Sequence, residues 1–141
     1  MAMELGIDVK SIEEMAIQGF KYSQRDLGDL YFHGVGVEQN YSQAIFWYAK
    51  AAEQGYAPAQ LNLGEMHFQG LGVEQNYSQA IFWYTKAAEQ GNADAQANLG
   101  NAFLAVNDAN QADFWLSKAS EQGHVHAQQK LQQLRTLLGL V

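Results

Sequence analysis

The chain of 141 residues contains no cysteine, a single proline and only eight basic residues against fifteen acidic ones. The lack of cysteine excludes disulfides, iron–sulfur clusters, thiolate zinc sites and a cysteine nucleophile. The eight lysines and arginines are scattered along a chain of net charge −7. We therefore expect no binding to nucleic acid or to membrane surfaces, because proteins bind both through clustered basic residues.

Long apolar runs are also missing, and none approaches the 18 residues of a transmembrane helix. The first residues are acidic and lack the basic-then-apolar order of a secretory signal. We therefore expect a cytoplasmic protein. With 48% hydrophobic residues, the chain has enough apolar side chains for one domain with a real core.

The main positive feature of the sequence is an internal repeat. Residues 23–58 align with residues 59–94 without a gap, and 25 of the 36 positions are identical. A divergent third copy occupies residues 95–126 and is four residues shorter. An N-terminal half-repeat at 11–22 and a capping helix at 127–141 flank the array. We predict a single domain in which each unit covers the apolar face of its neighbour.

Each unit is predicted to form two helices and no strand, because its apolar residues recur at helical spacing and never alternate. The second helix has a capping-box pattern, a short polar residue followed three positions later by glutamine, at Asn40, Asn76 and Asp108. It is expected to end at a left-handed glycine, namely Gly55, Gly91 or Gly123.

Two buried stripes follow from the same spacing. In the second helix the stripe consists of Ala44, Trp47, Tyr48 and Ala51, and in the first helix of Ala59, Leu63, Met66 and His67. Gly64 is expected to allow close approach of the two helices. Pro58 stands at the entry to the first helix, where its missing N–H does no harm.

These motifs resemble the Sel1-like repeat family, a relative of the tetratricopeptide repeat. The matching residues of the first copy are Leu27-Gly28, Tyr31, Gly34 to Val37, Ala44, Trp47-Tyr48, Lys50 to Ala52 and Gln54-Gly55, with their counterparts 36 positions later. The departures are asparagine in place of aspartate at 40 and 76, histidine in place of tyrosine at 67, and loss of the G-x-G-V loop in the third copy. The resemblance implies an all-α fold, a right-handed α/α superhelical solenoid of helical hairpins. It further implies a non-catalytic adaptor or scaffold that binds other proteins, often in bacterial signalling, envelope or virulence.

Motifs for catalysis, cofactors or metals are not recognisable. His124 and His126 are two residues apart, which points them to different faces of a helix. The G-V-G-V and G-L-G-V segments lack the third glycine and the following Lys-Ser or Lys-Thr of phosphate loops, and they are expected to be interhelical turns. Relatives linked to β-lactam chemistry carry cysteines that this chain lacks. We expect no enzyme activity, no cofactor and no metal.

The resemblance places the first helices along a concave groove. By this alignment the groove residues are Tyr22, Arg25, Asp26, Asp29, Phe32, His33, Leu61, Asn62, Glu65, Phe68, Gln69, Asn98, Asn101, Leu104 and Lys130. Phe32 and Phe68 would be aromatic anchors within a polar rim, as protein-binding surfaces need. The alternative is that these two rings only close the gap between neighbouring units.

Two further apolar sets lie outside this groove. Phe46, Phe82 and Phe114 precede Lys50, Lys86 and Lys118 by four residues, and we expect them to pack under the next repeat rather than form a second interface. In the terminal helix, Leu131, Leu134 and Leu138 form a stripe that would drive self-association if it were only half covered.

The leading hypothesis is therefore an adaptor whose groove binds a peptide or another protein, with basic partners favoured by the net charge of −7. The alternative is an immunity protein that neutralises a cognate bacterial toxin. A hydrolase is a third hypothesis, and units that serve only as spacers are a fourth.

Overall fold

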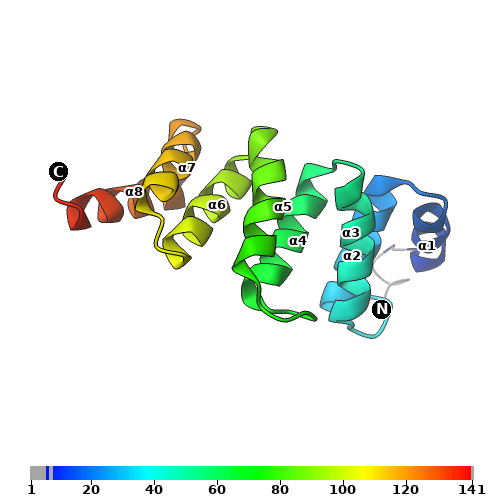
Figure 1. Cartoon of the computed structure of the whole chain (residues 1–141). Coiled ribbons are helices and arrows are strands. Elements are labelled where there is room, and N and C mark those ends of the chain that lie inside the picture. The colour runs from blue at the N-terminus through cyan, green and yellow to red at the C-terminus, as the bar shows by residue number, and fades with distance from the viewer. Residues whose placement is uncertain (1–5, 7, 141) are drawn as a thin grey trace.

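The computed structural model describes Gly6 and residues 8–140, and within this part the chain forms helices and no strand. The helices are α1 (Val9–Ile17), α2 (Lys21–His33), α3 (Tyr41–Glu53), α4 (Ala57–Gln69), α5 (Tyr77–Glu89), α6 (Ala93–Ala105), α7 (Ala109–Glu121) and α8 (Val125–Leu137). Figure 1 shows them in a row, in chain order from α1 to α8. Each helix packs mainly against its neighbours in sequence. The predicted all-α solenoid is confirmed.

The helices pair into the hairpins α2–α3, α4–α5 and α6–α7. Figure 1 shows α3 and α5 in front of α2 and α4. The first helices of successive hairpins lie close enough for α4 to contact α6 directly. We call the side of the molecule formed by α2, α4 and α6 the first-helix face.

The predicted ends of the second helices are confirmed. The side-chain oxygens of Asn40, Asn76 and Asp108 accept the backbone N–H three residues later at 3.0, 3.0 and 3.1 Å. Each cap satisfies a backbone donor that the helix leaves unpaired. The helices end just before Gly55, Gly91 and Gly123, whose φ angles of +84°, +93° and +86° are left-handed.

The hairpins close tightly at one glycine each. A Cβ on Gly28 or Gly64 would lie 2.6 Å from the ring of Tyr48 or Tyr84, and on Gly100 it would lie 2.6 Å from Leu116. These three partners are fully buried. The predicted close approach at Gly64 is confirmed, and it recurs in every hairpin.

The tryptophans join consecutive units. Within the predicted stripe of α3, Ala44, Tyr48 and Ala51 are buried, whereas Trp47 is half-buried. Trp47 packs on the cluster of Ala16, Leu27 and Leu30, which belongs to the preceding helices. Trp83 and Trp115 pack on the preceding clusters in the same way. The tryptophans therefore stabilise the stacking of units.

Pairs of glutamines, one buried and one exposed in each pair, also link the units. Gln60 on α4 donates to the Ala52 carbonyl at the end of α3 (3.1 Å) and accepts from Gln90 after α5 (2.9 Å). Gln90 in turn donates to the Gly55 carbonyl at 3.0 Å. The same pattern holds for the pairs Gln24/Gln54 and Gln96/Gln122. The buried glutamine of each pair thus has hydrogen-bond partners for its side-chain amide.

Replacing Gln60 with alanine should lower the free energy of unfolding by about 2 kcal/mol, because it removes both hydrogen bonds of a buried side chain. Urea unfolding followed by circular dichroism measures this loss. The control is Gln128→Ala, because Gln128 is exposed and only weakly bonded to the Ser120 carbonyl at 3.4 Å. It should cost less than about 0.5 kcal/mol. Equal losses in both variants would contradict a structural role for the buried glutamines.

Candidate protein-binding site

The first-helix face carries a cavity of about 320 Å³ where α2 meets α4. We call it the α2–α4 cavity. Its lining residues are Arg25, Asp29, Phe32, His33, Tyr48, Asn62, Glu65, Met66, Gln69 and Leu71. All but Tyr48 and Leu71 come from α2 and α4, whose exposed sides the resemblance assigned to the groove.

The Arg25 side chain supplies a positive charge within the α2–α4 cavity. The Arg25 guanidinium pairs through Nη1 with Asp29 Oδ2 at 3.2 Å, and its Nε donates to Asn62 Oδ1 at 3.1 Å. Asp29 Oδ1 accepts the Tyr48 hydroxyl at 2.5 Å. Burial raises the pKa of Tyr48, and the hydrogen bond to Asp29 raises this pKa further. The guanidinium thus bridges a carboxylate on one helix and an amide on the next.

A second cavity of about 310 Å³ follows where α4 meets α6. This α4–α6 cavity is lined by Glu65, Phe68, Gln69, Tyr84, Asn98 and Asn101. Glu65 accepts hydrogen bonds from Asn98 at 3.0 Å and from Gln69 at 2.6 Å. Asn101 Oδ1 is buried and has no hydrogen-bond donor among the described residues. Burial, followed by the negative charge of Glu65, raises the pKa of Tyr84.

Ten of the fifteen predicted groove residues line these two cavities. Arg25, Asp29, Phe32, His33 and Asn62 line the first, Phe68, Asn98 and Asn101 the second, and Glu65 and Gln69 both. The other five do not line them. Tyr22 lies edge-on against Tyr56 with ring centroids 5.0 Å apart, Leu61 and Leu104 pack on hydrophobic clusters, and Asp26 and Lys130 lie outside the cavities.

Phe32 and Phe68 are half-buried and serve packing as well as lining. Phe32 lies against Tyr41, with ring centroids 5.2 Å apart, and Phe68 lies against Tyr77 at 5.1 Å. Each phenylalanine also packs on the hydrophobic cluster that its hairpin shares with the next one. Each ring therefore seals its hairpin and also borders a cavity, and its role as an anchor for a bound partner stays a prediction.

Sequence reasoning missed Tyr48, Tyr84, Met66 and Leu71 as lining residues. The two tyrosines were assigned to the core, where their rings do lie. A usable signal was nevertheless present, because a buried tyrosine hydroxyl needs a hydrogen-bond partner. Carboxylates at Asp29 and Glu65 lie one residue beyond the glycines that face these tyrosines.

The phenylalanine row on the second helices is exposed, so the expectation that the next repeat covers it is wrong. Phe46, Phe82 and Phe114 remain 48%, 49% and 50% exposed. Each ring lies edge-on against the tryptophan that follows it, with centroids 5.0 Å apart. The lysine four residues later places Nζ 5.0–5.2 Å from the ring centroid. This cation–π contact covers one side of each ring within its own helix.

The histidines have structural surroundings. His67 is half-buried, and burial lowers its pKa. His124 caps α8 by accepting the Ala127 N–H through Nδ1 at 3.1 Å, while its Nε2 lies 2.9 Å from Asp94. Within residues 8–140, no group of three histidine, aspartate or glutamate side chains is placed to hold a metal ion. None of the described helices has the length and apolar character that crossing a membrane requires.

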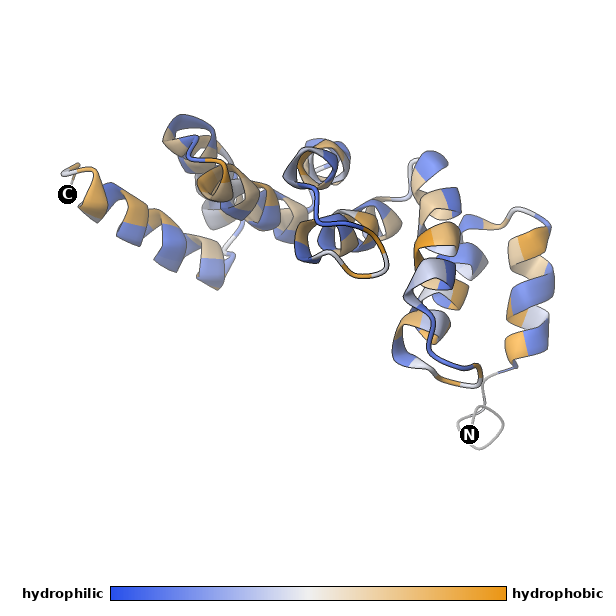
Figure 2. Ribbon diagram, turned by 60° about the horizontal axis from the view of Figure 1, so that its bottom comes forward, coloured by the Kyte–Doolittle hydropathy of each residue, from blue (hydrophilic) through white to orange (hydrophobic). Residues whose placement is uncertain are grey.

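The terminal helix α8 is amphipathic, and Figure 2 shows hydrophobic and hydrophilic positions alternating along it. Leu131 and Leu134 are buried against α7 and α6, whereas Leu138 is 50% exposed. Two of the three leucines of the predicted stripe are therefore buried within the molecule. Only Leu138 is left from this set for contacts with another chain.

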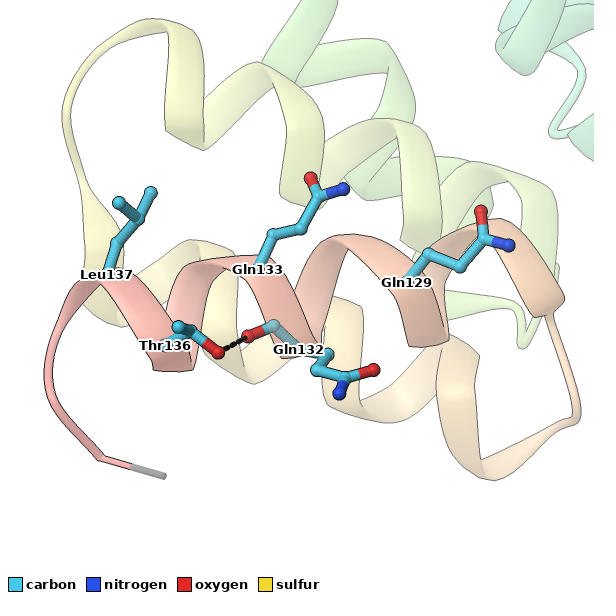
Figure 3. Close-up of a pocket in the computed structure, with 5 residues that line it drawn as sticks. All are labelled: Gln129, Gln132, Gln133, Thr136 and Leu137. Carbon is cyan, nitrogen blue, oxygen red and sulfur yellow. Dashed lines mark hydrogen bonds between the residues drawn. The ribbon is translucent and has the colours of Figure 1, made fainter.

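A shallow cavity of about 600 Å³ lies on the open side of α8. Figure 3 shows its lining residues, Gln129, Gln132, Gln133, Thr136 and Leu137. Gln132 occupies the repeat position of Gly100, because Leu131 aligns with Leu99. In α2, α4 and α6 this position is glycine and admits the second helix of the hairpin. The glutamine side chain prevents such an approach on α8.

Comparison with protein-family models identifies three Sel1 repeats, at residues 21–56, 57–92 and 93–124. A comparison with curated protein sequences gives no significant match. Among solved structures, the chain is similar to a protective antigen of uropathogenic Escherichia coli strains that displays an SLR fold. The two are 37% identical with a TM-score of 0.83, over 88% of this chain and 27% of that one.

A Sel1 repeat protein from Oxalobacter formigenes is 33% identical with a TM-score of 0.83, over 92% of this chain and 58% of that one. Helicobacter pylori cysteine rich protein B is 29% identical with a TM-score of 0.59, over 62% of this chain and 65% of that one. This chain spans less than two thirds of the length of each relative. Three matched repeats cover most of the sequence, and the stacked hairpins agree with them: the chain belongs to the Sel1 repeat family.

Proposed function

We propose that this protein is a non-catalytic scaffold that binds a segment of another polypeptide along the first-helix face. Sel1 repeat proteins typically act as scaffolds for protein–protein interaction. The observation that carries the proposal is the pair of adjacent cavities of about 320 and 310 Å³, which share Glu65 and Gln69. Together they form a row of polar groups and aromatic rings along three helices, which suits an elongated guest.

The described geometry gives no separate support to the toxin inhibitor or the hydrolase considered from the sequence. The proposal therefore concerns binding alone. Its partner is expected to carry basic residues, because the net charge of −7 favours association with cations. This association should slow at high salt, since salt screens long-range attraction.

The test is affinity capture from native cells with two matched pairs of bulky substitutions. His33→Trp and Gln69→Trp fill the cavities from exposed positions, whereas Gln43→Trp and Gln79→Trp place the same bulk on exposed sites of α3 and α5. Mass spectrometry identifies the partners that the unmodified protein captures. The captured amount of these partners should fall at least tenfold with the His33→Trp/Gln69→Trp variant and stay the same with the Gln43→Trp/Gln79→Trp variant. Retention by a folded His33→Trp/Gln69→Trp protein would refute binding on this face.

A further inference from the structure

The two cavities are copies of one site, displaced by one repeat. Every residue that lines the α4–α6 cavity stands 36 positions after a residue that lines the α2–α4 cavity. The pairs are Asp29/Glu65, Phe32/Phe68, His33/Gln69, Tyr48/Tyr84, Asn62/Asn98 and Glu65/Asn101. The two copies differ in their charged groups, because Leu61 stands at the position of Arg25 and Asn101 at that of Glu65.

In the first copy the chain provides its own cation. Arg25 lies between Asp29 and Asn62, and its guanidinium binds both at 3.2 and 3.1 Å. The acceptors come from two different helices, α2 and α4. A planar fork with several N–H donors suits this arrangement better than the single ammonium group of lysine.

In the second copy the acceptors remain and the cation does not. Among the described residues, Glu65 has no basic side chain within 4.0 Å. Glu65 accepts hydrogen bonds from Asn98 and Gln69, but neither of these donors carries a charge. The uncompensated negative charge therefore favours a ligand that brings positive charge. Phe68 and Tyr84 supply aromatic surface beside it.

We propose that the α4–α6 cavity binds the guanidinium of an arginine side chain of the partner polypeptide. This inference rests on the proposed function and names the residue that the bound segment presents. The guest guanidinium takes the place that Arg25 has in the first copy, with Glu65 as its carboxylate and the Asn98 oxygen as a further acceptor. The α2–α4 cavity is expected to bind an arginine more weakly, because Arg25 already pairs with Asp29 there.

The test adds blocked amino acids as probes to the full chain. Binding is monitored by NMR through the backbone and side-chain amide signals of Asn98 and Asn101. Nα-acetyl-arginine amide should shift these signals in a saturable manner. Nα-acetyl-citrulline amide, its uncharged counterpart, should bind at least tenfold more weakly, and Nα-acetyl-lysine amide should bind more weakly than arginine. Equal binding of the three probes, or no response to arginine at tens of millimolar, would overturn the proposal.

Three substitutions test the assignment within the protein itself. Leu61→Arg places an internal guanidinium four residues before Glu65, as in the first copy, and should weaken binding of the arginine probe at least tenfold. Glu65→Gln, which adds no bulk, should do the same. Arg25→Leu should create a second arginine site, seen as new shifts at Asn62. Thermal melting confirms that each variant is folded, and unchanged binding by folded Leu61→Arg and Glu65→Gln proteins would refute the assignment.

The outcome is separable from that of the proposed function. A natural partner that is lost from His33→Trp/Gln69→Trp but bound normally by Leu61→Arg would leave the scaffold role in place and reject the arginine site. Loss from both sets of variants supports the arginine site. Retention by both sets rejects the two proposals together.

Discussion

Replacing Gly64 with alanine is expected to lower the free energy of unfolding by about 2 kcal/mol, although alanine favours helices over glycine by about 1 kcal/mol. The reason is steric, because the new Cβ would lie 2.6 Å from the ring of Tyr84. Tyr84 is only 1% exposed and cannot move away without disturbing the core. Urea unfolding at neutral pH, followed by circular dichroism, measures the change.

A double-mutant cycle tests the cause of this loss. Tyr84→Ala alone should be strongly destabilising, since it empties a core position. In that background, however, Gly64→Ala should become neutral or stabilising, because the clashing ring is gone and the helix preference of alanine remains. If Gly64→Ala were equally harmful with and without the tyrosine ring, the close contact between α4 and α5 would not be its origin.

Stability should fall steeply above pH 10. Burial raises the pKa of Tyr48 and of Tyr84 in the folded protein, whereas tyrosines of the unfolded chain ionise near pH 10. Above this pH the unfolded state releases two protons that the folded state keeps. The free energy of unfolding should therefore drop by about 1.4 kcal/mol per pH unit for each tyrosine, while below pH 10 the contribution is fully present.

Urea midpoints measured from pH 9 to pH 12 test this expectation. The double variant Tyr48→Phe/Tyr84→Phe should have a lower free energy of unfolding at pH 9, because it lacks the hydroxyls that bond to Asp29 and Glu65. Its midpoints should then fall much less with rising pH. Tyr22→Phe is the control, since Tyr22 is 62% exposed. A double variant with the same pH slope as the unmodified protein would contradict the role of these hydroxyls.

The helix boundaries and the turns were accessible from the sequence because their causes are local. Asn40 caps α3 through its own side chain and the N–H three residues later. Gly55 ends that helix through a backbone angle of its own residue. Neither effect depends on what the helix packs against, so the composition of a short segment is enough to predict it.

The candidate site was accessible only in part. The resemblance gave the phase of the first helices, and that phase placed Arg25, Asp29 and Asn62 on one face as expected. It did not show that Arg25 bridges Asp29 and Asn62, because the latter contact joins residues 37 positions apart. Nor did it show that Tyr48 reaches Asp29 from the other helix of the hairpin. Such contacts depend on the distance between helices, which helical spacing does not contain.

The exposure of surface residues was equally undecided before the fold was known. Phe46 was expected to lie under the next repeat, yet its side chain is 48% exposed. Leu134 and Leu138 share a stripe on α8, but α7 and the neighbouring core cover only the first. Periodicity assigns residues to a face, whereas the extent of the neighbouring helix determines how much of that face is covered.

The sequence by itself determined that this protein is an array of helical hairpins, where the second helix of each hairpin begins and ends, and most residues of the inner stripes. These features follow from the preferences of individual residues and from the regular spacing of a copied unit. Only the tertiary structure decided which faces stay open, which polar groups find partners and which do not. Arg25 shows why: its hydrogen bond to Asn62 joins α2 to α4, and no local pattern in the sequence records how these two helices approach each other.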